Sequence, residues 1–480
     1  MSSSNAQTKW GQFIPLVTVF FFWGFVAASN DILIPVFKKA FSLEDWQSQL
    51  VSFAFYIAYT VGSIIYIGIS AATKKDIVER LGYKNSLALG LGISAMGTLL
   101  FYPAAEMASF PLMLSGLFIV ALGFSLQQTV ANPLAIALGP IQTGSQRLTL
   151  AGGINNFGTT IGPLIVSFAI FGSATGASTD VDLNSVKAPY LILGAAFLLV
   201  ALLLKFSSLP NHPELEEEVV TDVVAGKAKT SALQYPQLVM GMVAIFLYVG
   251  VEVSTASNLP AYLENGLGFA TSEVAPYISL YWASLMIGRW GGAVEAFTND
   301  KSAQTILKIV APYLAFGVFL GANYIMGHDL APFYIYAAII VVLIGADFAS
   351  KGNPATMLGL FSLLGITALL IGMFTEGIVS VYAFTSVGLF CSTLWPCIFT
   401  LAVSGLGKKT TQGSTFLIMM IMGGGIISLL QGWVAGIIGI HSSYIVGVVC
   451  FAYLAFYAFT VKGILSRQGI SFDRVSAGGH

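Results

Sequence analysis

Long apolar segments follow one another along the chain and are separated by short polar loops. A segment of about 20 apolar residues is long enough to cross a bilayer as an α-helix, the form in which a single span satisfies its own backbone hydrogen bonds. We expect spans at about 12–36, 49–70, 84–103, 112–138, 148–172, 188–206, 237–263, 273–297, 305–326, 332–348, 355–375, 378–404, 412–437 and 443–462. This pattern predicts an all-α polytopic membrane protein with about fourteen transmembrane helices.

A polar stretch divides these spans into a first group of six and a second group of eight. Its length and its charged residues are typical of a solvated linker. We therefore predict an N-terminal six-helix bundle at 1–206, a cytoplasmic linker at 207–236 and a C-terminal bundle at 237–480.

The composition agrees with a membrane protein. Of the 480 residues, 56% are hydrophobic and 9% are charged, whereas an average soluble domain has about 25% charged residues. The net charge of −1 offers no general attraction to nucleic acid, so no nucleic-acid partner is expected. Cys391, Cys397 and Cys450 all lie in apolar segments, which predicts neither a disulfide framework nor a metal site built on cysteines.

Basic residues are concentrated in alternate loops. One such loop contains Lys74 and Arg80, and another is assigned Arg289, Lys301 and Lys308. Because loops rich in Lys and Arg stay in the cytoplasm, we expect these loops and both chain termini to be cytoplasmic.

One acid lies inside the first apolar segment. Asp31 shares a helix face with Trp23, Ala27 and Ile34, and Asn30 precedes it. A carboxylate in hydrocarbon is costly unless it is paired, solvated or protonated, so an intramembrane acid is first interpreted as an ion or proton site. Alternatively, Asp31 lies at the level of the lipid headgroups or caps the end of its helix.

Side-chain amides occur inside several other spans. They offer both a donor and an acceptor, as a ligand rich in hydroxyl groups requires. The predicted substrate-binding residues are Gln128, Asn132, Asn155, Asn156, Glu252, Asn258, Trp282 and Trp395. The alternative for each amide is a hydrogen bond to a neighbouring helix, and the two tryptophans can equally be core or interface aromatics.

Arg289 lies in the segment Gly288–Gly292, at the predicted cytoplasmic end of a span. There it can pair with an acid such as Glu295 or with a helix end. We interpret Arg289 as a conformational latch.

These residues resemble the fucose–proton symporter family of the major facilitator superfamily. Three segments are more similar to its glucose/galactose branch: Gln128–Pro133, Asn155–Gly162 and Tyr248–Glu252. The matching segments are Asn30–Pro35, Pro103–Glu106, Ala131–Pro133, Asn155–Gly158, Gly372–Gly377, Gly413–Ser414 and Gly423–Gly425. The resemblance implies two six-helix bundles that rock about a central sugar site, with uptake of a monosaccharide driven by a cation gradient. Asp31 corresponds to the family's helix 1 aspartate, whereas Gln128 stands where the fucose transporter has a second essential acid.

The chain departs from a twelve-helix member of the family in length. The C-terminal bundle contains an additional helix pair at about 305–348, which we expect at the periphery. We expect it to be a structural or oligomer-contact addition.

The residues do not decide which ion is coupled to transport. Asp31, with amide oxygens from Asn30, Gln128 or Asn155, offers the oxygen ligands of a hard cation, and a lone aspartate can also bind a proton. Loss of the second acid with retention of the amides favours Na⁺, bound by Asp31, over H⁺.

The sequence therefore predicts a symporter of the bacterial inner membrane that imports a hexose such as glucose, galactose or mannose. Its expected partners are the monosaccharide, the coupling cation (Na⁺ or H⁺) and the lipid bilayer, with no cofactor and a monomer as the default state. The alternatives are proton coupling and, from another class, a membrane sugar sensor that does not transport. No motif of an enzyme is present.

Overall fold

The computed structural model describes residues 8–42, 50–74, 76–140, 143–171, 183–211, 231–269, 271–298 and 300–472. Within these ranges, the side chains at 30–36, 38, 39, 52, 163, 164, 167, 168, 170, 171, 185, 264, 265 and 271–275 are outside the description. Every regular element in the described ranges is a helix, which confirms the predicted all-α class.

The number of spans differs from the prediction. Twelve helices of the described residues are long and apolar enough to cross a membrane, not fourteen. The two predicted spans outside this set form α8 (Gly144–Phe171) and α11 (Thr271–Gly292), helices of 28 and 22 residues. Both include positions whose side chains are not described, and α11 is also less apolar because it ends in Gly-Arg-Trp-Gly-Gly.

The chain forms two compact units. Unit 1 comprises Met1–Thr8, Ile136–Gly153 and Glu214–His480, and unit 2 comprises Lys9–Ala135 and Ile154–Pro213. Helix α8 therefore contributes its first residues to unit 1 and the rest to unit 2. The domain boundaries predicted from the linker stay a prediction.

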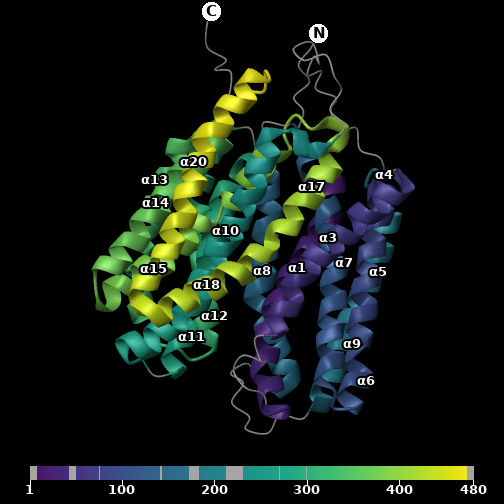
Figure 1. The fold of residues 1–480 in the computed structure, drawn as a ribbon. Helices are drawn as coiled ribbons and strands as arrows, with labels where there is room; N and C mark the ends of the chain where they lie inside the picture. The colour runs from purple at the N-terminus through teal and green to yellow at the C-terminus, as the bar shows by residue number, and fades with distance from the viewer. Residues whose placement is uncertain are drawn as a thin grey trace, which may run out of the picture. The chain divides into compact units, whose positions relative to one another are not determined.

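Unit 2 is a helical bundle in which α5 packs against α9 (Figure 1). Apart from its part of α8, its helices are α1 (Trp10–Ala40), α3 (Leu50–Thr73), α4 (Ile77–Leu81), α5 (Tyr83–Leu99), α6 (Phe101–Glu106), α7 (Phe110–Ala137) and α9 (Lys187–Phe206). Helix α1 continues past Pro35 to Ala40. Asp31 consequently lies within the helix and does not cap its end.

Glycines let α1 and α8 cross in backbone contact. A Cβ atom on Gly24 would lie 1.9 Å from the backbone oxygen of Asn155, and one on Gly158 would lie 2.3 Å from the backbone oxygen of Phe21. No larger residue fits at either position, because the obstacle is main chain and not a flexible side chain. Small residues at such crossings are the usual means of close helix packing in lipid.

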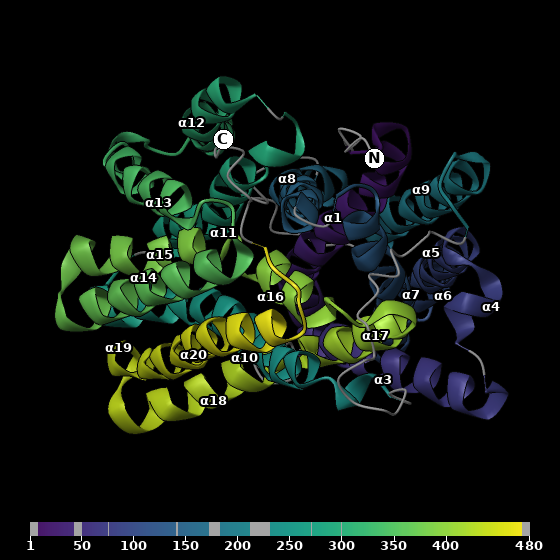
Figure 2. The same ribbon diagram turned by 90° about the horizontal axis from the view of Figure 1, so that it is seen from above.

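Unit 1 contains the remaining helices. They are α10 (Pro236–Ala261), α11, α12 (Lys301–Ile325), α13 (Tyr336–Ser350), α14 (Pro354–Phe374), α15 (Gly377–Cys391), α16 (Leu394–Val403), α17 (Thr410–Met419), α18 (Gly423–Ile438), α19 (Ile440–Ser443) and α20 (Ile445–Arg467). Helix α20 packs on both α14 and α10, and α10 also packs on α18 (Figure 2). The span formed by α15 and α16 is 94% buried, so it is the centre of this unit.

Glycine also allows the crossing of α10 and α18. A Cβ atom on Gly423 would lie 2.0 Å from the backbone oxygen of Phe246, whereas one on Gly425 would meet nothing within 4 Å. The closest backbone approach at this glycine triplet is therefore at Gly423.

Helices α12 and α13 cover the residues predicted as an additional pair. Helix α12 packs on α11, and α13 packs on α14 and α15 at the edge of the unit (Figure 2). Only 28% of the α12 span is buried, and its exposed apolar side chains, which include Ile306 and Leu314, suit contact with lipid.

Helix α14 begins with a strong local signal. The Asn353 side chain accepts hydrogen bonds from the backbone N–H groups of Ala355 (3.0 Å) and Thr356 (3.1 Å), and Pro354 occupies the first helical position. An asparagine cap followed by proline satisfies otherwise unpaired donors and sets the first backbone angle.

Candidate functional site

The predicted ion-binding residues on α1 can be placed only by their backbone. Asn30 and Asp31 lie in the continuous helix α1, but their side chains are outside the described residues. Their predicted roles therefore stay predictions.

A buried hydrogen-bond network joins α1 to two other helices of unit 2. The indole N–H of Trp23 donates to Oε1 of Gln127 (2.9 Å), and Nε2 of Gln127 donates to Oγ of Ser94 (3.1 Å). Ser94 in turn donates to the backbone oxygen of Val120 (2.9 Å). Gln127 is fully buried, so this residue, which the sequence did not single out, holds α1, α5 and α7 together.

Gln128, the residue next to Gln127, contacts a different helix. Nε2 of Gln128 donates to the hydroxyl oxygen of Tyr59 on α3 (3.1 Å), and the side chain is half-buried. Successive residues on a helix are about 100° apart, so Gln127 and Gln128 serve different surfaces. Tyr59 was not anticipated, because nothing in the sequence marks it among the other aromatics of α3.

Asn132 lies one turn after Gln128 on α7 and is 1% exposed. Its Nδ2 atom has no hydrogen-bond partner among the described residues. Pro133 follows it and lacks a backbone N–H, which interrupts the helical hydrogen bonding at this point. A buried amide without a partner is rare in a folded protein, and it is suited to receive a polar ligand.

The two asparagines on α8 make different contacts. Nδ2 of Asn155 donates to the backbone oxygen of Phe20 on α1 (3.0 Å), which is the helix-bridging role that the sequence left open. Asn156 is 2% exposed, and its backbone oxygen accepts from the hydroxyl groups of Thr159 and Thr160, both at 2.8 Å.

In unit 1 the predicted residues of α10 meet aromatic side chains. The Tyr248 hydroxyl donates to Oε2 of Glu252, one turn further along the helix, and the Tyr281 hydroxyl of α11 donates to the backbone oxygen of Glu252 (2.8 Å). The ring of Trp395 lies 6.3 Å from that of Tyr248. Trp282 packs edge-on against Tyr281, at 5.5 Å between ring centres.

Asn258 lies further along α10. Its Nδ2 atom donates to the backbone oxygen of Ser254 (2.9 Å), within its own helix, and the side chain is half-buried. Its carboxamide oxygen is not used by this contact.

Arg289 is 9% exposed and is held by three groups of unit 1. Its Nε donates to the backbone oxygen of Ser392 (2.9 Å), its Nη1 to the backbone oxygen of Gly152 (3.2 Å), and its Nη2 to the hydroxyl of Tyr248 (3.4 Å). Through these contacts Arg289 joins α11 to the first turns of α8, and its role as a conformational latch stays a prediction.

Glu295 belongs to an ion cluster of Lys308, Glu295 and Asp347. Nζ of Lys308 lies 3.0 Å from Oε1 of Glu295 and 2.7 Å from Oδ2 of Asp347, and the three side chains are 5–8% exposed. Nε2 of Gln146 on α8 donates to Oε2 of Glu295 and to the backbone oxygen of Gly352, both at 3.0 Å.

The assignment of Lys308 to a cytoplasmic loop is therefore wrong, because the residue is buried on α12. The sequence contained an indication that Lys308 is not a loop residue. Lys308 and Asp347 are charged residues inside predicted spans, the same feature that singled out Asp31.

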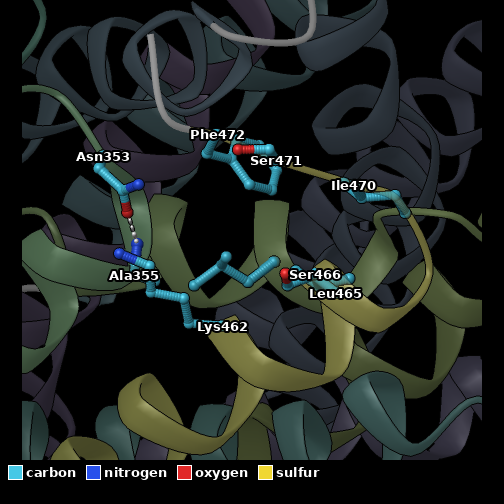
Figure 3. Close-up of a pocket in the computed structure, with 9 residues that line it drawn as sticks. Asn353, Ala355, Lys462, Leu465, Ser466, Ile470, Ser471 and Phe472 are labelled. Carbon is cyan, nitrogen blue, oxygen red and sulfur yellow. Dashed lines mark hydrogen bonds between the residues drawn. The ribbon is translucent and has the colours of Figure 1, made fainter. Parts of the chain in front are cut away.

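A small pocket lies at another place in unit 1, between the start of α14, α16 and the end of α20 (Figure 3). Asn353, Leu401 and Lys462 line it, together with residues 465–466 and 470–472. None of the predicted site residues whose side chains are described lines this pocket.

A bundle of apolar helices joined by buried amides and ion pairs is the architecture of a multi-pass membrane protein. Residues 16–350 match the sequence profile of the Major Facilitator Superfamily. The chain is 33% identical over 460 residues, 95% of each chain, to the glucose/galactose transporter of Brucella abortus biovar 1 (strain 9-941). It is 30% identical over 466 residues, 93% of this chain and 92% of the relative, to the L-fucose–proton symporter of Escherichia coli (strain K12).

The fold leads to the same relatives. The crystal structure of the superfamily transporter FucP in the outward conformation matches with a TM-score of 0.69 and 27% identity, over 94% of this chain and 98% of that one. The chain thus belongs to the Major Facilitator Superfamily and, within it, to the fucose–proton symporter family. It is a transporter and not an enzyme, as predicted.

Proposed function

We propose that the chain is a proton-coupled symporter that imports a hexose, with glucose and galactose as the first candidates. The observation that carries this proposal is the similarity to a glucose/galactose transporter over 95% of both chains. The buried amides of unit 2 support it, because Asn132 presents an unpartnered donor and Gln128 lies on the same face of α7.

Proton coupling replaces the preference for sodium. The relatives whose names state an ion, from Escherichia coli and Haemophilus influenzae, are L-fucose–proton symporters. Nothing in the described residues favours Na⁺ over H⁺. Oxygen ligands alone do not discriminate between them, since an aspartate in an apolar surrounding binds a proton without further ligands.

The proposed roles follow the chemistry of each side chain. Asp31 binds the coupling proton, with Asn30 beside it. In unit 2, Gln128, Asn132, Asn155 and Asn156 hydrogen-bond the hydroxyl groups of the sugar.

In unit 1, Glu252 and Asn258 provide further polar contacts to the sugar. Trp282 and Trp395 offer aromatic faces to its C–H groups. Arg289 acts as the conformational latch. The protein operates in a bacterial inner membrane with both termini in the cytoplasm, as the distribution of basic loops predicts.

Proteoliposomes test this function directly. Purified protein is reconstituted and uptake of D-glucose, D-galactose, D-mannose and L-fucose is measured with a pH gradient, a Na⁺ gradient or neither. We expect concentrative uptake of at least one hexose with an inward proton gradient and no dependence on Na⁺. Uptake that persists without a proton gradient but requires Na⁺ would overturn proton coupling.

The Asp31→Asn variant tests the coupling residue. It removes the ionisable group and preserves the side-chain shape, so we expect loss of concentrative uptake with retention of sugar exchange across the membrane. Full gradient-driven accumulation by Asp31→Asn would exclude Asp31 as the proton site.

A further inference from the structure

A glutamine on α18 is buried with both ends of its amide unpaired. Gln431 is 0% exposed, and neither its Nε2 nor its Oε1 atom has a hydrogen-bond partner in the part of the chain that the structure describes. An unpaired buried amide destabilises the folded state, and such groups are rare in folded proteins. The presence of Gln431 at this position therefore points to a ligand that satisfies the amide.

The packing of α18 on α10, both in unit 1, shows which residue faces Gln431 (Figure 2). A Cβ atom on Gly250 of α10 would lie 2.5 Å from the side chain of Ile427 on α18. The crossing at Gly423, described above, is one turn earlier on both helices, so the helices run in the same direction and in register. Ser254 and Gln431 each lie one turn further on, which brings these two residues opposite each other.

Ser254 has the same feature as Gln431. It is 0% exposed, and its Oγ atom also has no hydrogen-bond partner among the described residues. Its backbone oxygen accepts a hydrogen bond from Nδ2 of Asn258 at 2.9 Å. The unpaired groups of Ser254 and Gln431 therefore lie one turn from Asn258, which is one of the sugar contacts proposed above.

The chemistry of the two side chains suits an uncharged ligand with hydroxyl groups. The amide of Gln431 offers two N–H donors and an oxygen acceptor, and the hydroxyl of Ser254 can donate and accept. Neither side chain is charged, so the pair offers no counter-charge to an ion. Space is available beside it, because a Cβ atom on Gly432, the residue after Gln431, would meet nothing within 4 Å.

We propose that Gln431 and Ser254 hydrogen-bond one hydroxyl group of the transported sugar, and that Gln431 thereby helps to determine which sugar is carried. This inference rests on the proposed function and deepens it. A site that hydrogen-bonds a hydroxyl group discriminates against an analogue that lacks this group, because the buried polar atoms of the site are then left unpaired. Gln431 thus favours sugars that have a hydroxyl group at the position it contacts.

The test uses the full chain in proteoliposomes. Uptake of D-glucose, D-galactose, D-mannose and L-fucose identifies the preferred sugar, and KM is then measured for that sugar and for its monodeoxy analogues, each of which lacks one hydroxyl group. The Gln431→Leu variant removes the amide and keeps a side chain of similar volume. We expect its KM for the preferred sugar to rise roughly tenfold, the effect of one lost hydrogen bond to a buried group.

The analogues locate the contact. One monodeoxy analogue should already have a raised KM in the wild type, and Gln431→Leu should not raise it further, because the hydroxyl group that Gln431 contacts is missing. An unchanged KM for the preferred sugar, or an equal rise in KM for the sugar and for every analogue, would overturn the inference.

The melting temperature without sugar separates this role from a structural one. Leucine in place of an unpaired buried amide removes an unfavourable group, so the sugar-free Gln431→Leu variant should melt no lower than the wild type. The stabilisation that added sugar gives to the wild type should be reduced in the variant. A lower melting temperature with an unchanged KM would mean that Gln431 holds a trapped water and not the sugar, and this result would overturn the inference.

The chain offers a matched control at another buried glutamine. Gln127 is hydrogen-bonded at both ends of its amide, by Trp23 and by Ser94. Gln127→Leu makes the same substitution at a glutamine with partners, so it should lower the melting temperature. It should not reproduce the selective change in KM among the monodeoxy analogues.

Two further variants decide the matter if Gln431→Leu does not fold, as judged by gel filtration in detergent. Gln431→Met is an apolar change that keeps the length of the side chain, and Ser254→Ala removes only the facing hydroxyl. Both should raise KM for the preferred sugar and spare the same monodeoxy analogue. A KM identical to that of the wild type in both variants would contradict the inference.

Failure of the inference and failure of the proposed function look different. If the wild type takes up a probe sugar with a proton gradient and the Gln431 and Ser254 variants do so with the same KM, only the role of these residues is wrong. If the wild type takes up none of the probe sugars, the proposed function itself is wrong.

Discussion

Replacement of Lys308 by methionine should destabilise unit 1 strongly. The residue is the cation of the ion cluster, and its Nζ lies 3.0 Å from Glu295 and 2.7 Å from Asp347. Methionine has a similar length and no charge, so the change removes the positive charge with little change in packing. It leaves two buried carboxylates, 5% and 8% exposed, without the ammonium group of Lys308.

The size of the expected destabilisation follows from the burial of these carboxylates. Removing one partner of a buried ion pair costs about 3–5 kcal/mol, because the charge that remains is not solvated. At about 2 °C per kcal/mol, this corresponds to a fall of roughly 6–10 °C in the apparent melting temperature of the protein in detergent. Melting is followed by the loss of the monodisperse gel-filtration peak after heating.

Single-acid variants provide the controls. The cluster has two negative charges and one positive charge, so Glu295→Gln or Asp347→Asn leaves one neutral pair. Each should lower the melting temperature less than Lys308→Met does. If Lys308→Met melts within about 2 °C of the wild type, or if the acid variants are the more damaging, the charge balance of the cluster is not what stabilises this region.

Three further predictions concern packing and hydrogen bonding. Gly423→Ala should greatly reduce the yield of folded protein, because its Cβ would lie 2.0 Å from the Phe246 carbonyl oxygen, whereas Gly425→Ala meets nothing within 4 Å and should fold normally. Gln127→Leu should lower stability by about 1–3 kcal/mol, because it leaves buried partners unpaired, and an unchanged melting temperature would contradict this. Asn353→Ala removes the cap of α14 and should cost about 1 kcal/mol in the same assay.

The division of the chain into helices could be predicted from the sequence with few errors. The bilayer imposes this result, because a segment of about 20 apolar residues has no alternative to a helix there. Pro35 lies inside helix α1. A proline usually interrupts a helix, but neighbouring helices in a membrane protein can satisfy the freed carbonyl, and α1 continues to Ala40.

The candidate site was predictable in kind but not in detail. Polar residues inside spans marked Asp31, Gln128, Asn132 and Glu252, because such residues are expensive in lipid wherever they occur. Their partners did not follow from the same signal. The sequence offered Glu295, six residues away, as a partner for Arg289, but it did not indicate the contacts of Arg289 with Tyr248, Gly152 and Ser392.

The amino-acid sequence by itself determined the all-α membrane class and the set of polar residues that need a partner, because hydrophobicity and charge are properties of each residue. Only the tertiary structure decided which partner each one has. Gln127 and Gln128 are chemically identical neighbours. Gln127 is buried between three helices, whereas Gln128 donates a hydrogen bond to Tyr59. Hydrogen bonds and ion pairs depend on distances of a few ångströms between different helices, and only the packing of those helices sets such distances.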